Sequence, residues 1–154
     1  MQAIILAAGM GKRLKQLTQN NTKCMVKVNG VPLINRTLSQ LEQHDLSRIV
    51  IVTGYEGQKL REHIESLHIK TPVVFIDNPV YDRTNNIYSL FLAKDYLLKE
   101  DTLLLVRTNP SANGRNNGII SNFLSPLIIL KLSTPKYNNI KIAANACASA
   151  VNYR

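Results

Sequence analysis

Short apolar runs alternate with helical periodicities along the first 105 residues of the chain. Runs of four consecutive apolar residues at 3–6, 49–52, 73–76 and 103–106 predict four buried strands. Apolar residues at helical spacing predict three helices between them, the first beginning at Pro32 and the third capped by Asn85 or Thr84. The predicted apolar faces are Leu33, Thr37, Leu38 and Leu41 in the first helix, Leu60, Ile64 and Leu67 in the second, and Ile87, Leu90, Phe91 and Leu98 in the third. This alternation predicts an α/β fold with a mostly parallel sheet and right-handed crossovers.

The sequence changes character after about Val106. Nine of the 53 residues from 102 to 154 are Asn, none is acidic, and the apolar runs 119–132 and 142–151 lack clean caps. We therefore expect a domain over residues 1–105 and an atypical, poorly ordered segment over 106–154. Two interpretations of this segment stay open: a second, poorly patterned subregion, or a truncated or frame-shifted continuation of the domain.

Composition narrows the class of protein. A chain of 154 residues that is 45% apolar matches one ordinary domain and excludes global disorder. No apolar run reaches the roughly 18 residues of a membrane span, and the cations follow the apolar stretch Ala3–Met10 where a secretory signal would have them before it. Cys24 and Cys147 lie far apart with no CxxC or histidine-rich neighbour, which indicates neither a disulfide framework nor a zinc site and favours a cytoplasmic location.

The net charge of +9 is unevenly distributed. Residues 1–41 and 102–154 each carry a net charge of +6, and all ten acidic residues lie between Glu42 and Asp101. A basic patch near one loop favours a polyanionic ligand. Nucleic acid is the alternative for a pI near 9.8, but no RNP, KH, zinc-finger or helix-turn-helix spacing is visible and aromatic residues make up only 6%. We therefore expect a small anionic ligand and no nucleic acid.

The loop after the first predicted strand reads Leu-Ala-Ala-Gly-Met-Gly-Lys-Arg over residues 6–13. Glycines directly after a buried strand let backbone N–H groups approach an anion, and Lys12 and Arg13 add charge. A P-loop would need glycine where Leu6 stands. A dinucleotide fingerprint would need a third glycine where Leu14 stands and an acidic residue about 20 positions later. The loop is neither of these.

These residues resemble the nucleotidyltransferase family that activates sugar phosphates and phosphocholine. The family signature, Leu-Ala-Ala-Gly-x-Gly-x-Arg-Leu followed by Thr, Pro-Lys and Gly-x-Pro-Leu, matches residues 6–14, Thr18, Lys23 and 30–33, with Thr22 in place of the proline. Segments 51–55 and 78–79 also fit, and 85–90 is most similar to phosphocholine cytidylyltransferases. The resemblance covers residues 1 to about 105. It implies a three-layer, Rossmann-like sheet of the GT-A-like type, truncated or altered after the fourth strand.

The resemblance also implies an activity: transfer of NMP from an NTP, with CTP favoured, to phosphocholine or a sugar 1-phosphate, releasing pyrophosphate, in cell-surface polysaccharide biosynthesis. Mg²⁺ is the implied cofactor, and Lys23 and Arg13 are the implied catalytic residues. The implied nucleotide-binding residues are Leu6, Ala7, Ala8, Gly9, Gly11, Lys12, Arg13, Lys23, Asn85, Asn86 and Ser89. For Asn85 a simple helix cap stays open as the alternative. Tyr81, Tyr88 and Phe91 could include an aromatic residue for a quaternary ammonium, although for Tyr88 and Phe91 a place in the core is favoured over a choline cage.

One departure from the family concerns the metal. Family members place an aspartate just beyond the fourth strand to hold Mg²⁺, whereas this chain continues Val-Arg-Thr-Asn over residues 106–109 and has no carboxylate thereafter. Glu100 and Asp101 precede the strand and are expected at its other end. Two hypotheses follow: a nucleotidyltransferase, or a non-catalytic nucleotide-binding remnant that lacks the metal site. A GT-A glycosyltransferase is a third, but the chain has no Asp-x-Asp for its metal.

Overall fold

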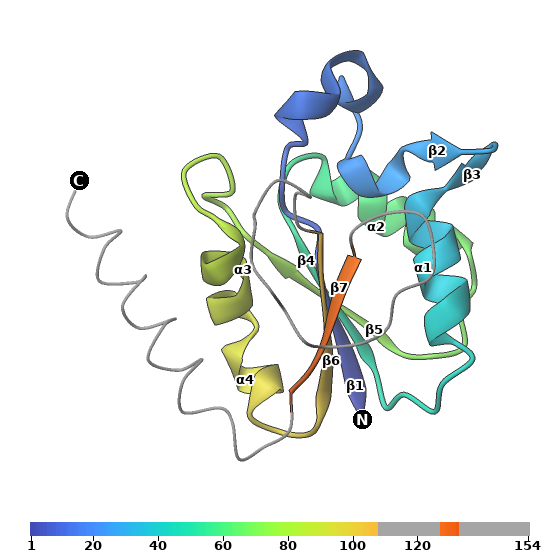
Figure 1. Ribbon diagram of the computed structural model, residues 1–154, viewed down its shortest axis with the longest axis vertical. Helices are drawn as coiled ribbons and strands as arrows, with labels where there is room; N and C mark the ends of the chain where they lie inside the picture. Colours follow the sequence, from blue (N-terminus) through green and yellow to red (C-terminus); the bar gives the residue numbers. More distant parts are fainter. Residues whose placement is uncertain (108–126, 133–154) are drawn as a thin grey trace.

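A twisted, mostly parallel sheet lies between helices in the computed structural model, which describes residues 1–107 and 127–132 (Figure 1). Its strands are β1 (Gln2–Leu6), β4 (Ile49–Thr53), β5 (Val73–Asp77), β6 (Thr102–Arg107) and β7 (Leu127–Leu132), in the order β5-β4-β1-β6-β7. The first four of these strands run parallel, and β7 pairs antiparallel with β6. The mostly parallel α/β fold and its four predicted strands are confirmed.

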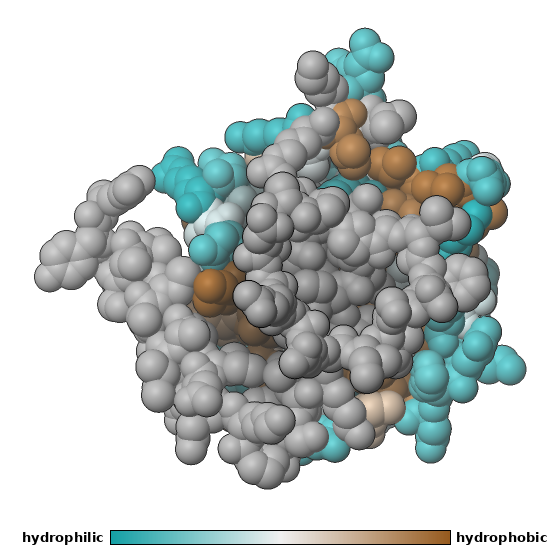
Figure 2. Space-filling view, viewed as in Figure 1, coloured by the Kyte–Doolittle hydropathy of each residue, from teal (hydrophilic) through white to brown (hydrophobic). Residues whose placement is uncertain are grey.

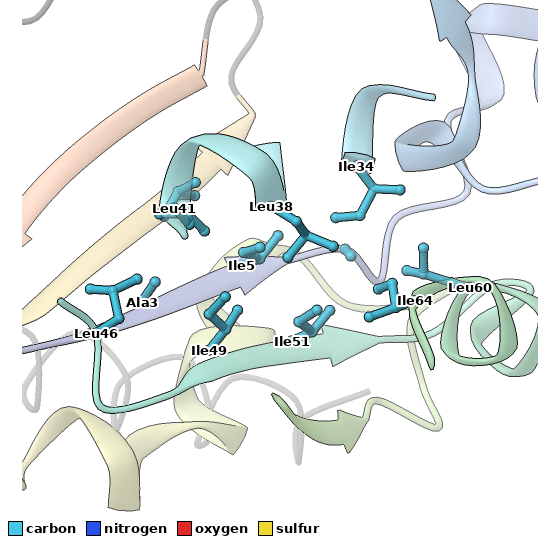
Figure 3. Close-up of a cluster of buried hydrophobic side chains, with 12 residues drawn as sticks. Ala3, Ile5, Ile34, Leu38, Leu41, Leu46, Ile49, Ile51, Leu60 and Ile64 are labelled. Carbon is cyan, nitrogen blue, oxygen red and sulfur yellow. The ribbon is translucent and has the colours of Figure 1, made fainter. Parts of the chain in front are cut away.

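Alternate residues of the central strands serve the two faces of the sheet, because successive side chains of a strand point to opposite sides. Ile5 and Ile51 face α1 (Leu33–Leu41) and α2 (Gly57–Ser66) in the core cluster shown in Figure 3. Ile4 and Val50 face α3 (Asn86–Leu92) and α4 (Lys94–Leu97). All four of these strand residues are buried, and this explains why the strands are continuous apolar runs.

The chain order of the strands creates a switch point in the sheet. From β1 the chain passes to β4 and then β5 on one side, and afterwards crosses to β6 on the other side of β1. In open α/β sheets, ligands bind outside the carboxyl ends of the strands at such a point. The loop that follows β1 therefore lies where this architecture places a ligand.

The apolar face predicted for the third helix is confirmed at Leu90, which packs against the core, and is wrong at its two ends. The segment forms two helices that meet at Ala93, and the predicted core residues Ile87 and Leu98 are 43% and 53% exposed. The buried stripe is instead Ser89, Ala93 and Leu97, at intervals of four residues. Ser89 is polar and Ala93 is small, so a pattern of large apolar side chains does not reveal this stripe.

Three short elements between β1 and α1 were not predicted: η1 (Lys12–Thr18), η2 (Lys23–Met25) and a hairpin of β2 (Lys27–Val28) and β3 (Val31–Pro32). The hairpin turn is Asn29-Gly30, and both residues have positive φ, 51° and 77°. Asn-Gly is the signal for such a two-residue turn and could have revealed it. Pro32 ends β3 and directly precedes α1. The hairpin carries exposed apolar surface at Val28 and Val31, and Figure 2 shows hydrophobic surface there.

Most of the atypical segment predicted over 106–154 lies outside the described residues, so its predicted boundary and poor order stay predictions. Within it, β7 pairs with β6 from Thr102↔Leu132 to Arg107↔Leu127. Among the described residues, no helix has the length and apolar character needed to cross a membrane.

Candidate functional site

The loop after β1 leaves the sheet at the switch point. Leu6 ends β1, and Ala7 and Ala8 are buried beside β4, where Ala7 donates its N–H to the carbonyl of Val52 at 2.8 Å. Gly9 is exposed, and a Cβ built on it would meet no atom within 4 Å. The loop is thus anchored at its start and open at Gly9, which leaves its backbone accessible to a ligand.

Gly11 packs this loop against the segment that follows. Its φ of +65° is in the left-handed region, and an added Cβ would lie 2.9 Å from Thr18 Cγ2 and 3.3 Å from Lys23 Cβ. Thr18 donates its hydroxyl to the carbonyl of Gly11 at 3.1 Å. Only glycine allows both this conformation and this close approach. Gly11 therefore brings the end of η1 and the start of η2 against the glycine loop.

The predicted cations lie on these two short helices. Lys12, which is exposed, and Arg13 begin η1, and Lys23 begins η2 and is half-buried. Residues 1–41 contain no acidic residue, so this segment carries no negative side chain of its own. The structure thus places Lys23 against the predicted phosphate-binding loop.

A second wall of the site comes from the loops after β4 and β5. Gly54 lies so close to the first loop that an added Cβ would be 2.6 Å from Ala8 O and 2.7 Å from Tyr81 Cβ. Tyr55 donates its N–H to the carbonyl of Ala8 at 3.2 Å, and the rings of Tyr55 and Tyr81 meet edge to face with centroids 6.1 Å apart. Three loops from three neighbouring strands therefore converge at the carboxyl end of β1.

A buried hydrogen-bond network joins the loop after β5 to α3. Asn78 donates its side-chain amide to Thr84 Oγ1 at 3.1 Å and to Ser89 Oγ at 3.2 Å. Asn85 caps α3, because its Oδ1 accepts from the N–H groups of Ile87 and Tyr88 at 3.0 and 3.3 Å. The capping alternative for Asn85 is thus observed, and contact with a nucleotide stays a prediction.

The other two predicted residues of α3 differ in exposure. Asn86 is exposed, whereas Ser89 is only 3% exposed and is held by Asn78. η2 packs on the α1 and α2 face of the sheet, and α3 packs on the opposite face. The two predicted groups of site residues therefore flank the end of β1 from opposite faces. Phe91, a candidate for a cation-binding cage, faces Lys94 Nζ at 4.6 Å from its ring centroid.

The carboxylates of the described residues do not fit the Mg²⁺ site that the resemblance implies. Mg²⁺ requires oxygen ligands, and the strand-end carboxylate that the fold offers, Asp77 on β5, is paired with Arg61 at 3.2 Å and hydrogen-bonded to Thr53. Glu100 pairs with the Met1 amino group at the amino ends of the strands, opposite the proposed site. The described part of the chain holds no group of three or more His, Cys, Asp and Glu side chains that could bind a metal.

Sequence patterns missed the roles of Gly54 and Asn78 in building the site. Both residues stand in segments that resemble the family, which is the signal that could have identified them. Tyr81 is expected from the sequence only as one of three aromatic candidates for a quaternary ammonium, and its packing against Gly54 and Tyr55 depends on contacts that the sequence does not reveal.

Comparisons with known proteins agree with this geometry. Residues 3–108 match the family model described as the MobA-like NTP transferase domain. The choline-phosphate cytidylyltransferase of Haemophilus influenzae is 41% identical over 119 residues, covering 72% of this chain and 49% of the relative. The CTP:phosphoglutamine cytidylyltransferase of Campylobacter jejuni is 37% identical over 99 residues, covering 64% of this chain and 38% of the relative.

A solved structure extends the likeness to three dimensions. The CTP:phosphocholine cytidylyltransferase of Streptococcus pneumoniae matches with a TM-score of 0.57 and 34% sequence identity, over 71% of this chain and 47% of that chain. This chain therefore spans about half the length, or less, of the relatives that it matches.

Proposed function

Because the chain belongs to the family of MobA-like NTP transferase domains, we propose that the loop after β1 binds a nucleoside triphosphate, with CTP preferred. The observation that carries this proposal is the packing of Gly11, with its left-handed backbone, against Thr18 and Lys23. It places an open glycine backbone and a lysine together at the switch point of the sheet, with the predicted cations Lys12 and Arg13 on η1. The preference for CTP is supported by the names of the cytidylyltransferase relatives.

The reaction that we propose for this site is nucleotidyl transfer. A phosphate oxygen of a small phosphorylated acceptor attacks the α-phosphorus of the nucleotide, and the bond from that phosphorus to the bridging oxygen of pyrophosphate breaks. Such chemistry consists mostly of positioning and charge neutralisation. Lys23 supplies a compact charge beside the α-phosphate, and Arg13 with Lys12 neutralises the triphosphate. The acceptor is phosphocholine, a sugar 1-phosphate or a related compound.

A second function, nucleotide binding without transfer, is favoured by one specific observation. β6 ends at Arg107, where the resemblance requires a metal-binding aspartate, and residues 102–154 contain no carboxylate. The same loop would then hold the nucleotide with its own cations. The described residues hold no group of three or more side chains that could bind Mg²⁺.

Gly9 offers a direct test of nucleotide binding. Since the space around its Cβ position is open, Gly9→Ala and Gly9→Val should fold like the wild type, with unchanged thermal unfolding. A ligand that approaches the loop backbone would meet the added side chain, so CTP affinity measured by calorimetry should fall from glycine to alanine to valine. Normal CTP binding by Gly9→Val would remove this loop from the site.

Arg13→Ala tests the charge at the same loop. We expect it to weaken CTP binding by about 1.5–3 kcal/mol, the scale of a charge-assisted contact. Lys70→Ala is the charge-matched control. Lys70 is exposed and precedes β5, so it lies at the amino ends of the strands, away from the proposed site. Equal losses in the two variants would show that only net charge matters.

A further inference from the structure

Lys59 reaches from α2 to the segment that carries the proposed site. Its ammonium donates a hydrogen bond to the backbone carbonyl of Asn20 at 2.8 Å, across 39 positions of sequence. Asn20 lies in the turn between η1 and η2 and has a left-handed φ of 55°. Figure 1 shows η1 and η2 as the blue segment above the sheet, with α2 beside it. The contact therefore ties a helix of the core to a turn that lies outside it.

The turn held by Lys59 is short, and both of its ends belong to the site. Thr18, two residues before Asn20, packs on Gly11 and donates to its carbonyl. Thr22, two residues after, is fully buried, and Lys23 follows it against Gly11. Asn21 N–H bonds the Thr18 carbonyl at 3.4 Å, and Met25 N–H bonds the Thr22 carbonyl at 3.0 Å. A shift of Asn20 would thus move Thr18 and Lys23 relative to the glycine loop.

α2 itself is firmly anchored, so it can serve as a support for this turn. Leu60 and Ile64 are buried in the core beneath it. His63 Nε2 lies 2.7 Å from Asn35 Oδ1 on α1, and Arg61 pairs with Asp77 on β5 and stacks on the ring of Phe75. Packing and polar contacts therefore hold α2 in place, and Lys59 extends from this fixed helix to Asn20.

We propose that Lys59 is a positioning residue for the nucleotide site, holding the turn at Asn20 so that Lys23 stays against the glycine loop. This inference rests on the proposed nucleotide binding. Without the tether the turn populates additional conformations, and apparent affinity falls in proportion to the fraction of molecules whose site is assembled. Because the contact is exposed, we expect a change of about three- to tenfold in affinity and no loss of global stability.

The experiment compares three variants with the wild type. Lys59→Met keeps the aliphatic stem and removes the ammonium, and Lys59→Arg restores a donor of similar reach. Lys70→Met removes the same charge at the amino ends of the strands, away from the proposed site. We expect CTP to bind about three- to tenfold more weakly to Lys59→Met, nearly normally to Lys59→Arg, and normally to Lys70→Met, with unchanged unfolding temperatures throughout.

Amide hydrogen exchange supplies a readout that does not depend on the nucleotide. Lys59→Met should accelerate exchange at Asn21 and Met25 and leave the amides of β4 unchanged. Unchanged exchange at Asn21 and Met25 overturns the tether, and so does wild-type CTP affinity in Lys59→Met. If wild-type protein binds no CTP, the proposed function falls, and exchange alone then decides whether Lys59 holds the turn.

Discussion

Thr22 stands where the resembling family has proline, and its hydroxyl has no visible role. The residue is 0% exposed, and among the described residues its Oγ1 has no hydrogen-bond partner. A buried hydroxyl without a partner carries a desolvation cost of about 1–3 kcal/mol. Thr22 therefore offers a site at which a loss of polarity should strengthen the fold.

Thr22→Val should raise the free energy of unfolding by about 1 kcal/mol, because it removes the hydroxyl and nearly conserves volume. Thr18→Val is the matched control on the same segment. It removes a hydroxyl that donates to Gly11, and should lower the free energy of unfolding by about 1 kcal/mol. Denaturant titration of both variants measures the two signs. A destabilised Thr22→Val would mean that the hydroxyl is bound, for example by a buried water molecule.

At the scale of elements, Glu100 joins the amino ends of three strands. Glu100 itself lies just before β6. Its carboxylate pairs with the Met1 amino group before β1 at 3.0 Å and with Arg48 before β4 at 3.4 Å, and it accepts a hydrogen bond from Ser47 Oγ at 2.7 Å. The hydrogen bond from Ser47, and after it the hydrogen bond from the terminal amine, lower the pKa of Glu100 below its ordinary value.

Glu100→Gln should therefore lower stability at neutral pH and lose this effect in acid. A carboxyl whose pKa is depressed in the folded state stabilises the protein above its unfolded pKa, and that stabilisation disappears as pH falls through the folded value. We expect a difference of about 0.5–1 kcal/mol at pH 7 that shrinks below about pH 5. Denaturant unfolding at several pH values measures it, and Asp95→Asn on the exposed surface of α4 is the charge control. A difference that does not change with pH would assign the loss to packing.

At the scale of the whole molecule, the loops of the proposed nucleotide site lie together, whereas residues 1–107 and 127–132 hold no group of three or more side chains that could bind a metal. Three loops, after β1, β4 and β5, converge with Lys23 at the carboxyl ends of these strands. Asp77 is paired with Arg61 and Glu100 with the Met1 amino group, and no acidic residue follows Asp101 in the sequence. Displacement of an in-line phosphoryl centre by about 1 Å costs roughly 100-fold in rate, and the loss of a charge clamp costs more.

We therefore expect the chain to bind CTP weakly and to release pyrophosphate at least about 100-fold more slowly than the Haemophilus influenzae relative assayed beside it with Mg²⁺ and phosphocholine. Arg107→Asp should not restore the rate by itself, because the chain spans about half of that relative. A panel of nucleotides, phosphocholine and sugar 1-phosphates covers the candidate substrates. Robust Mg²⁺-dependent release by the chain as it stands would contradict this expectation and would mean that a carboxylate such as Asp77, Asp82 or Asp101 reaches the site.

The sequence alone determined the four parallel strands and the place of the glycine loop after the first of them. Four apolar residues in a row leave no polar side to a strand, so burial on both faces and a parallel sheet follow from the local pattern. Glycines and cations directly after the first strand likewise predict an anion-binding loop from neighbouring residues only. The contact between Gly11 and Thr18 is also local, because the two residues are only seven positions apart in the sequence.

Tertiary structure alone decided the features that depend on distant residues. Ser89 is buried and accepts a hydrogen bond from Asn78, so the third helix buries a polar residue that apolar periodicity does not predict. Gly54 meets Ala8, and Lys59 meets Asn20, across 46 and 39 positions of sequence. A periodic pattern records which side of an element is apolar. The partner of a polar group depends instead on how the elements pack, and that packing is set by the sheet order and the layers around it.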